Sequence, residues 1–262
     1  MLLKWRIITD FRTIFEQIPE EFDKWRPRYC DELFNDLIHY ANLTPNSKVL
    51  EVGPGTGQAT DPILNTGCNF TAIELGEVFS HILKEKYQSY PNFKVLNADF
   101  ETYPFPDNHF DLVYSAAAFQ WIPEQIGYPK AYSILKSGGT FTMFMMRADV
   151  RPGGGYTDEP LFSEIQEVYK KYFKHECEYK CKLDYDAREK YGFNHLERRK
   201  YLKTRTYNAD DYVSLISTHA DHITLKELNK TYFYEGVRQV ILNHGNSITL
   251  YDRITLYLAK KP

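Results

Sequence analysis

The chain has 262 residues, a formal net charge of −3 and a hydrophobic share of 43%. This length allows one large domain or one domain with a cap, and the hydrophobic share is sufficient for an ordinary core, which argues against disorder. A general nucleic-acid binder usually carries a strong basic excess. No run reaches the roughly 18 apolar residues that span a bilayer, and the N-terminal stretch is too charged for a secretory signal. These totals predict a cytoplasmic protein without a nucleic-acid or membrane partner.

The segment 19–43 is expected to form a turn followed by a helix that starts near Pro27. Proline is common in the first turn of a helix, where its missing N–H is not needed. Apolar residues recur at helical spacing through the segment, as expected for a helix with one buried face. These residues are Leu33, Phe34, Leu37, Ile38 and Leu43.

From Ser47 to Arg147, short apolar runs alternate with amphipathic segments. Strands separated by helical patterns predict βαβ units and a parallel sheet. The strands are apolar on both faces, which is typical of a sheet covered by helices on both sides. The expected strands are 48–52, 69–74, 93–99, 110–116 and 140–146, and the expected helices are 57–67, 77–90 and 128–136.

A break rich in glycine and proline follows at 151–160. The pattern after it predicts helices and two more strands, the last of which alternates in polarity to the end of the chain. The expected helices are 161–173, 209–218 and 225–245, and the expected strands are 196–207 and 247–260.

Three glycines, Gly53, Gly55 and Gly57, follow the first expected strand directly. Without a Cβ, they allow a sharp turn and the close approach of a ligand. In a parallel sheet the ligand site lies beyond the carboxyl ends of the strands. The nicotinamide fingerprint G-x-G-x-x-G fails because Gln58 occupies its sixth position, and the phosphate loop G-x-x-x-x-G-K-[ST] is absent.

The next two strands end in acids. Glu74 lies about 20 residues after the loop, where a carboxylate can accept hydrogen bonds from ribose hydroxyls. Asp99 ends the third strand and is followed by Phe100, a pair that can bind the amine and the ring of an adenine. A glycine loop and two acids at three successive strand ends predict an adenosine ligand.

Five motifs in this order resemble the class I S-adenosylmethionine-dependent methyltransferases, and in particular the small-molecule branch of trans-aconitate methyltransferase-like, or type 11, proteins. They read "VLEVGPGTGQAT", "AIE", "NADFE", "FDLVYSAAAFQWI" and "LKSGGTF". The "WRPRY" before the sheet also resembles that branch, and so do "TYNADDYVSLIST" and "ITLYLAKK" near the C-terminus. The resemblance covers about residues 22–146 well.

The resemblance implies roles for individual residues around S-adenosylmethionine and its product S-adenosylhomocysteine. The glycine loop would face the methionine part and the ribose, and Glu74 would bind the ribose diol. Leu75, Asp99 and Phe100 would hold the adenine. Ser115 and Ala116 would lie near the sulfonium, and Trp25 and Arg26 would close over the cofactor. The implied cofactor-binding residues are Trp25, Arg26, Gly53, Pro54, Gly55, Glu74, Leu75, Asp99, Phe100, Ser115 and Ala116.

The fold implied by the resemblance is α/β and Rossmann-like. It is a doubly wound, seven-stranded, mostly parallel sheet with an antiparallel C-terminal strand, an N-terminal lid helix and a small inserted cap. The expected divisions are 1–46 for the lid helices, 47–149 for the core of the cofactor-binding domain, 150–195 for the cap and 196–262 for the completion of the sheet.

The expected reaction is methyl transfer to a small molecule by in-line displacement, mainly through proximity and orientation. No catalytic residue is named: Gln120 stands where the family often has histidine, and an amide is not a general base. Two alternatives remain, a non-catalytic adenosine-binding regulatory protein and a nicotinamide-dependent oxidoreductase. The chain is expected to be a monomer or a homodimer.

Two further patterns involve candidate metal ligands and basic residues. His175, Cys177 and Cys181 lie close together, but a fourth ligand is missing, so no metal is expected. A basic run from Arg198 to Arg205 is interpreted as a solvated strand edge, with Arg198 or Lys200 as candidates to reach an acidic group of the acceptor.

Overall fold

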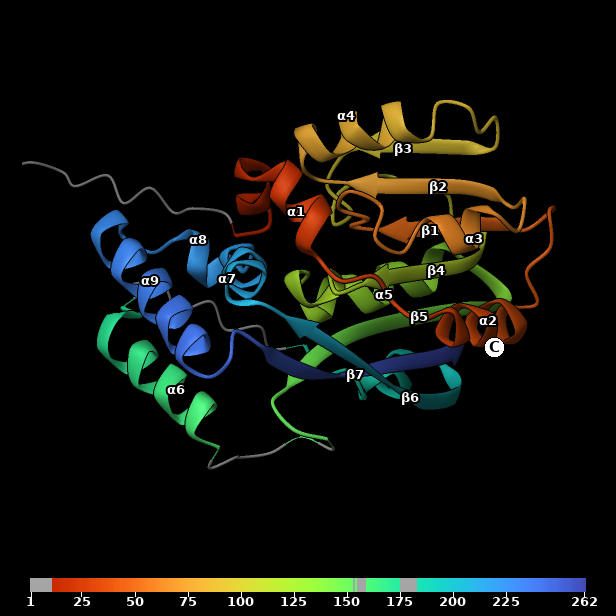
Figure 1. Cartoon of the computed structure of the whole chain (residues 1–262). Coiled ribbons are helices and arrows are strands. Elements are labelled where there is room, and N and C mark those ends of the chain that lie inside the picture. The colour runs from red at the N-terminus through yellow and green to blue at the C-terminus, as the bar shows by residue number, and fades with distance from the viewer. Residues whose placement is uncertain (1–10, 153, 155–158, 175–182) are drawn as a thin grey trace, which may run out of the picture.

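The computed structural model describes residues 11–152, 154, 159–174 and 183–262. Seven strands form one sheet in the order β3-β2-β1-β4-β5-β7-β6 (Figure 1). The five strands from β1 to β5 pair in parallel, and β7 runs antiparallel to both of its neighbours. The expected fold class is confirmed. The strands are β1 Lys48–Val52, β2 Asn69–Glu74, β3 Phe93–Asn97, β4 Phe110–Ala116, β5 Leu135–Asp149, β6 Asn194–Tyr207 and β7 Ile248–Lys260.

Helices cover both faces of the parallel part of the sheet. Successive strand residues point to opposite faces, so Val49 belongs to one apolar cluster and Leu50 to the other, and both are fully buried. The first cluster includes residues of α2, α3 and α4, and the second includes residues of α5. The helices are α1 Pro19–Trp25, α2 Asp31–Ala41, α3 Asp61–Leu64, α4 Glu77–Lys86, α5 Glu124–Ile134, α6 Pro160–Tyr172, α7 Ala209–Ser217, α8 Ala220–Ile223 and α9 Glu227–Asn243.

The expected helix start at Pro27 is wrong. Residues 19–25 form a separate helix, α1, and α2 begins only at Asp31. Arg26 is extended, with φ −66° and ψ 129°. A residue before proline is pushed toward extended conformations by the proline ring, so Pro27 ends the first helix instead of starting the second. An extended link, residues 26–30, joins α1 to α2.

A third apolar cluster joins helices that lie on both sides of β6 in the sequence. α6 packs on α9, and α7 packs on α9, around the fully buried Phe233 and Val237. These helices gather with α8 beyond the carboxyl ends of β1 and β2 (Figure 1). We call α6, α7, α8 and α9 the helical cap. The predicted cap was residues 150–195. In the structure, α6 from that range packs with helices from residues 209–243, which lie outside it.

Among the described residues, no helix combines the length and the apolar character that a membrane crossing requires.

Replacing Phe141 by alanine is expected to lower the free energy of unfolding by about 3–5 kcal/mol. Phe141 is fully buried on β5, and its ring lies 5.1 Å from that of Phe119 and 5.2 Å from that of Phe193. The measurement is urea denaturation. Leu202→Ala on the edge strand β6 is the control. Leu202 is 75% exposed, so its replacement should change the free energy of unfolding little. Equal effects of the two variants would contradict this account of the core.

Candidate functional site

A cavity of about 640 Å³ lies between the carboxyl ends of the strands and the helical cap. One end of its wall is formed by the glycine loop and the ends of β2 and β4. The other end is formed by α6, α7 and the start of α8. The sheet and the cap therefore enclose one continuous space. Of the predicted site residues, those that line it are Arg26, Gly53, Pro54, Gly55, Glu74, Leu75, Asp99, Phe100 and Ala116.

The glycine loop needs its glycines for two reasons. Gly53 and Gly55 have φ of +67° and +61°, in the region that side chains with a Cβ rarely adopt. A Cβ on Gly53 would also lie 2.5 Å from the Cβ of Ala118, and one on Gly55 would lie 3.2 Å from the ring of Phe22. The loop therefore exposes backbone atoms to the cavity. Ala118 and Phe22 pack against its glycines and leave no room for side chains there.

Glu74 ends β2 with a buried carboxyl group that binds backbone on two sides. Its Oε2 accepts a hydrogen bond from Gly55 N at 3.0 Å, and its Oε1 accepts one from Gly76 N at 3.0 Å. Burial raises the pKa of Glu74 to about 7, although these two N–H groups act in the opposite direction. The carboxyl group thus lies beside the glycine loop, as the sequence predicted.

Asp99 lines the cavity after β3 and is bound to an arginine that the sequence analysis missed. Arg12 Nη1 lies 3.1 Å from Asp99 Oδ2 and 2.9 Å from Glu101 Oε1. Phe100 is buried at 4% exposure, 6.2 Å from the ring of Phe119, and also reaches the cavity wall. No local pattern marks Arg12, because its partners lie almost 90 positions away.

Arg26 is half-buried and lines the cavity at the start of the link between α1 and α2. Its Nη2 donates to the carbonyl oxygen of Thr218 at 2.7 Å, and its guanidinium lies 5.3 Å and 5.1 Å from the ring centres of Phe15 and Phe22. Its Nε is buried without a hydrogen-bond partner among the described residues. Burial lowers the pKa of Arg26 to about 10, so the group remains a cation at neutral pH. Arg26 thus brings a positive charge to the cavity wall, and such a charge attracts anionic groups.

Two predicted residues are not brought to the cavity wall. Ser115 is buried in β4, and its Oγ donates to the carbonyl oxygen of Val52 at 2.8 Å, so it joins β4 to β1. Trp25 is the last residue of α1 and lies outside the lining, whereas Trp121 is part of it. The tryptophan that reaches the cavity thus comes from the turn after β4.

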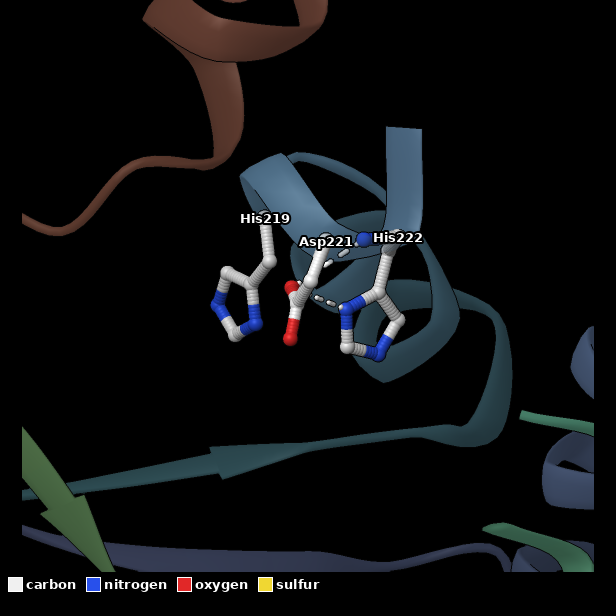
Figure 2. Close-up of side chains that lie close together, drawn as sticks. All are labelled: His219, Asp221 and His222. Atoms are coloured by element: carbon white, nitrogen blue, oxygen red, sulfur yellow. Dashed lines mark hydrogen bonds and ion pairs between the residues drawn. The ribbon is translucent and has the colours of Figure 1, made fainter. Parts of the chain in front are cut away.

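The cap end of the cavity holds polar groups that the sequence analysis also missed. Tyr169 Oη lies 3.0 Å from His222 Nε2, and His222 Nδ1 lies 2.8 Å from Asp221 Oδ1. Figure 2 shows Asp221 between the rings of His219 and His222. His219 lines the cavity, and burial lowers its pKa to about 3, so its ring is neutral. The short sequence His-Ala-Asp-His at 219–222 was the available signal.

The basic run on β6 reaches the cavity at one point, Arg205, which pairs with the fully buried Asp252. The candidates Arg198 and Lys200 were wrong as acceptor ligands in this structure, since neither lines the cavity, and Arg198 lies 3.6 Å from Asp186 instead. The reason is strand alternation, which turns these residues away from Arg205. The predicted cysteine and histidine group at 175–181 lies outside the described residues.

Residues 50–143 match the protein family described as "Methyltransferase domain". Sterol methyltransferase-like 3 of Botryococcus braunii is 28% identical over 195 residues, which are 63% of this chain and 47% of that protein. Ribosomal RNA small subunit methyltransferase A of Borrelia garinii subsp. bavariensis is 29% identical over 121 residues, which are 44% of this chain and 42% of that protein. The chain spans less than half the length of these two relatives.

A solved structure with the same fold is phosphoethanolamine N-methyltransferase 2 of Haemonchus contortus, in complex with phosphomonomethylethanolamine and S-adenosylhomocysteine. It is 15% identical, with a TM-score of 0.57 over 96% of this chain and 60% of that chain. At this identity the likeness shows the fold alone. The region that matches the methyltransferase domain, residues 50–143, contains the glycine loop and the strands β2, β3 and β4. The chain therefore has the α/β Rossmann-like fold and, in this region, is similar to a methyltransferase domain.

Proposed function

We propose that this chain transfers a methyl group from S-adenosylmethionine to a small-molecule acceptor bound under the helical cap. The observation that carries the proposal is the single cavity that runs from the glycine loop to α6 and α7. Its volume of about 640 Å³ is in the range of sites for small ligands. A cofactor at the sheet end and an acceptor at the cap end would share this space, with the methyl group between them.

At the sheet end, the proposed cofactor contacts follow the geometry. The backbone of 53–55 faces the methionine part and the ribose, and Glu74 accepts hydrogen bonds from the ribose diol. Asp99, Leu75 and Phe100 surround the adenine. Arg26 is the cation for the amino-acid carboxylate, because its Nε has no partner among the described residues. Ala116 lies near the sulfonium. Trp25 lies outside the cavity wall and would influence cofactor binding through the link before α2. Ser115 also lies outside the wall and would do so through the hydrogen bond that joins β4 to β1.

The proposed reaction needs alignment more than a reactive side chain. The acceptor atom attacks the methyl carbon in line with the carbon–sulfur bond, and the electron pair of that bond stays on sulfur to give S-adenosylhomocysteine. The sulfonium is already activated, so positioning and the exclusion of water carry most of the catalysis. Met145, Met146 and Trp121 line the middle of the cavity and would exclude water there.

A small molecule is favoured over RNA by two observations, although a ribosomal RNA methyltransferase is among the relatives. Side chains of α6, α7 and α8 line the acceptor end of the cavity, and its volume of about 640 Å³ suits a small molecule. The basic side chains of β6 are also largely matched by acids: Arg199 lies 3.1 Å from Asp36, and Arg205 pairs with Asp252. A continuous basic track is what a phosphate backbone would need. A cytoplasmic location and a monomer or homodimer remain predictions from the sequence.

Glu74→Ala is expected to weaken binding of S-adenosylmethionine about tenfold or more, because charge-assisted hydrogen bonds are worth roughly 1.5–3 kcal/mol each. The measurement is calorimetric titration of the purified full chain. Glu77→Ala is the matched control, since Glu77 is exposed at the start of α4. Unchanged affinity in Glu74→Ala would remove the carboxyl group from the site. Tight binding of NADH in place of the adenosyl ligands would support the oxidoreductase alternative.

The affinity for the cofactor is also expected to depend on pH. Burial raises the pKa of Glu74 to about 7 without ligand, and ribose hydroxyls bind the ionised form best. Binding therefore releases a proton below that pKa, so affinity should fall as the pH drops below about 7 and level off above it. Titrations from about pH 6 to 8 measure this, and Glu74→Gln should remove that part of the dependence. Wild-type affinity that rises toward low pH would contradict the assignment.

Product analysis with methyl-labelled S-adenosylmethionine tests the acceptor class. The full chain is incubated separately with a metabolite extract, purified RNA and whole protein, and the label is followed into each fraction. We expect label in the small-molecule fraction and none in RNA or protein. Label in RNA alone would overturn the small-molecule acceptor but not the cofactor. Cofactor binding without any labelled product would support the non-catalytic regulatory alternative.

A further inference from the structure

A chain of three polar side chains crosses the cap from its surface to the cavity. Tyr169 of α6 lines the cavity, and its Oη lies 3.0 Å from Nε2 of His222 in α8. His222 is only 3% exposed, and its Nδ1 lies 2.8 Å from Oδ1 of Asp221, which is 52% exposed. The three side chains therefore reach from the cavity wall at Tyr169 to solvent at Asp221. Figure 2 shows the contact between Asp221 and His222.

Elementary chemistry fixes the direction of both hydrogen bonds. An ionised carboxylate can only accept, so Nδ1 of His222 donates to Asp221, and in the tautomer with its one hydrogen on Nδ1 the ring satisfies this bond. Nε2 is then left without a hydrogen and accepts from the hydroxyl of Tyr169. The backbone N of His222 also donates to Asp221 Oδ1 at 3.0 Å, and the ring of Phe173 lies 4.6 Å from that of His222. These contacts hold the imidazole in one orientation.

We propose that Tyr169, His222 and Asp221 form a proton relay for the methyl acceptor, an inference that rests on the proposed function. Tyr169 is the catalytic residue, because it touches the cavity, and His222 and Asp221 are positioning residues that complete its chemistry. The relay implies an acceptor whose nucleophile carries a proton, with a hydroxyl group as the class that needs it most. An acceptor that is already anionic would need no such chain.

The proposed step conserves atoms and charge. The acceptor oxygen forms a bond to the methyl carbon while the carbon–sulfur bond breaks and leaves its electron pair on sulfur. The hydroxyl proton of the acceptor passes to Oη of Tyr169, whose own proton passes to Nε2 of His222. The products are a methyl ether, S-adenosylhomocysteine and an imidazolium beside Asp221, which stabilises it. The proton then leaves through Asp221 to water.

The surrounding groups are compatible with this direction of transfer. His219 is neutral because burial lowers its pKa to about 3, so it does not compete as the proton carrier. Arg205 is matched by Asp252, and Arg26 donates to the carbonyl oxygen of Thr218, the residue before His219. A metal ion is the competing interpretation, since ligand atoms of His219, Asp221 and His222 lie within 4.8 Å of one another. The relay is favoured because both nitrogens of His222 already have partners.

Nitrogen NMR of the full chain with labelled histidine tests the relay without any acceptor. We expect His222 to carry its hydrogen on Nδ1, with an unprotonated Nε2 whose signal shifts in Tyr169→Phe. Tyr172→Phe is the matched control, because Tyr172 is also on α6 but stacks on Tyr232 and does not line the cavity. A hydrogen on Nε2 of wild-type His222, or a signal that Tyr169→Phe leaves unchanged, would overturn the relay.

Turnover provides the second measurement, with labelled S-adenosylmethionine and metabolite extract as the probe. Tyr169→Phe and His222→Gln should slow labelling of the small-molecule fraction by about a hundredfold or more, while cofactor affinity stays at the wild-type value. His244→Gln, at the end of α9 outside the cavity lining, should behave as wild type. Labelling at the wild-type rate in Tyr169→Phe overturns the relay and leaves the proposed function intact.

Two further outcomes are decisive. The absence of labelled product with the wild-type chain would overturn the proposed function and, with it, the catalytic role of the relay. Titration with Co²⁺ alone should give no ligand-field absorption. Absorption bands that appear with Co²⁺ and disappear in His219→Ala would overturn the relay in favour of a metal site.

Discussion

The carboxyl group of Glu74 joins two loops that the rest of the site depends on. It accepts from Gly55 N in the glycine loop and from Gly76 N in the turn before α4. The two loops follow adjacent parallel strands, so these bonds fix the spacing of the β1 and β2 ends at the cavity floor. Burying a carboxyl group is costly unless donors satisfy it. The buried carboxyl group of Glu74 is satisfied by backbone N–H groups of two loops. The same hydrogen bonds hold those loops in position.

The long antiparallel strands explain how the cap is held over that floor. β5 pairs with β7 from Thr140 opposite Lys260 to Asp149 opposite Tyr251, far beyond the end of β4 at Ala116. β7 in turn pairs with β6 over most of its length. The three strands form an extension of the sheet, and the helices of the cap are connected to its ends. The acceptor end of the cavity is therefore built on the sheet and not on loops alone.

The sequence was sufficient for the parts that depend on local pattern. Short apolar runs separated by helical patterns predicted the sheet, and glycines at one strand end and acids at the next two ends predicted the loop and the strand ends that hold Glu74 and Asp99. The sequence was insufficient where contacts between residues far apart in the chain determine the structure. Arg12 meets Asp99, and Tyr169 meets His222, across 87 and 53 positions, and no periodicity reports such pairs. Pro27 misled because proline can follow a helix as well as start one.

Gly53 also limits which sequences can have this fold. A Cβ at this position would lie 2.5 Å from the Cβ of Ala118, in the turn after β4. Positions 53 and 118 are far apart in the chain, yet the space between them has room for only one Cβ atom. A homologue with a side chain at 53 would need glycine at 118 and a rebuilt loop, because φ at Gly53 is +67°.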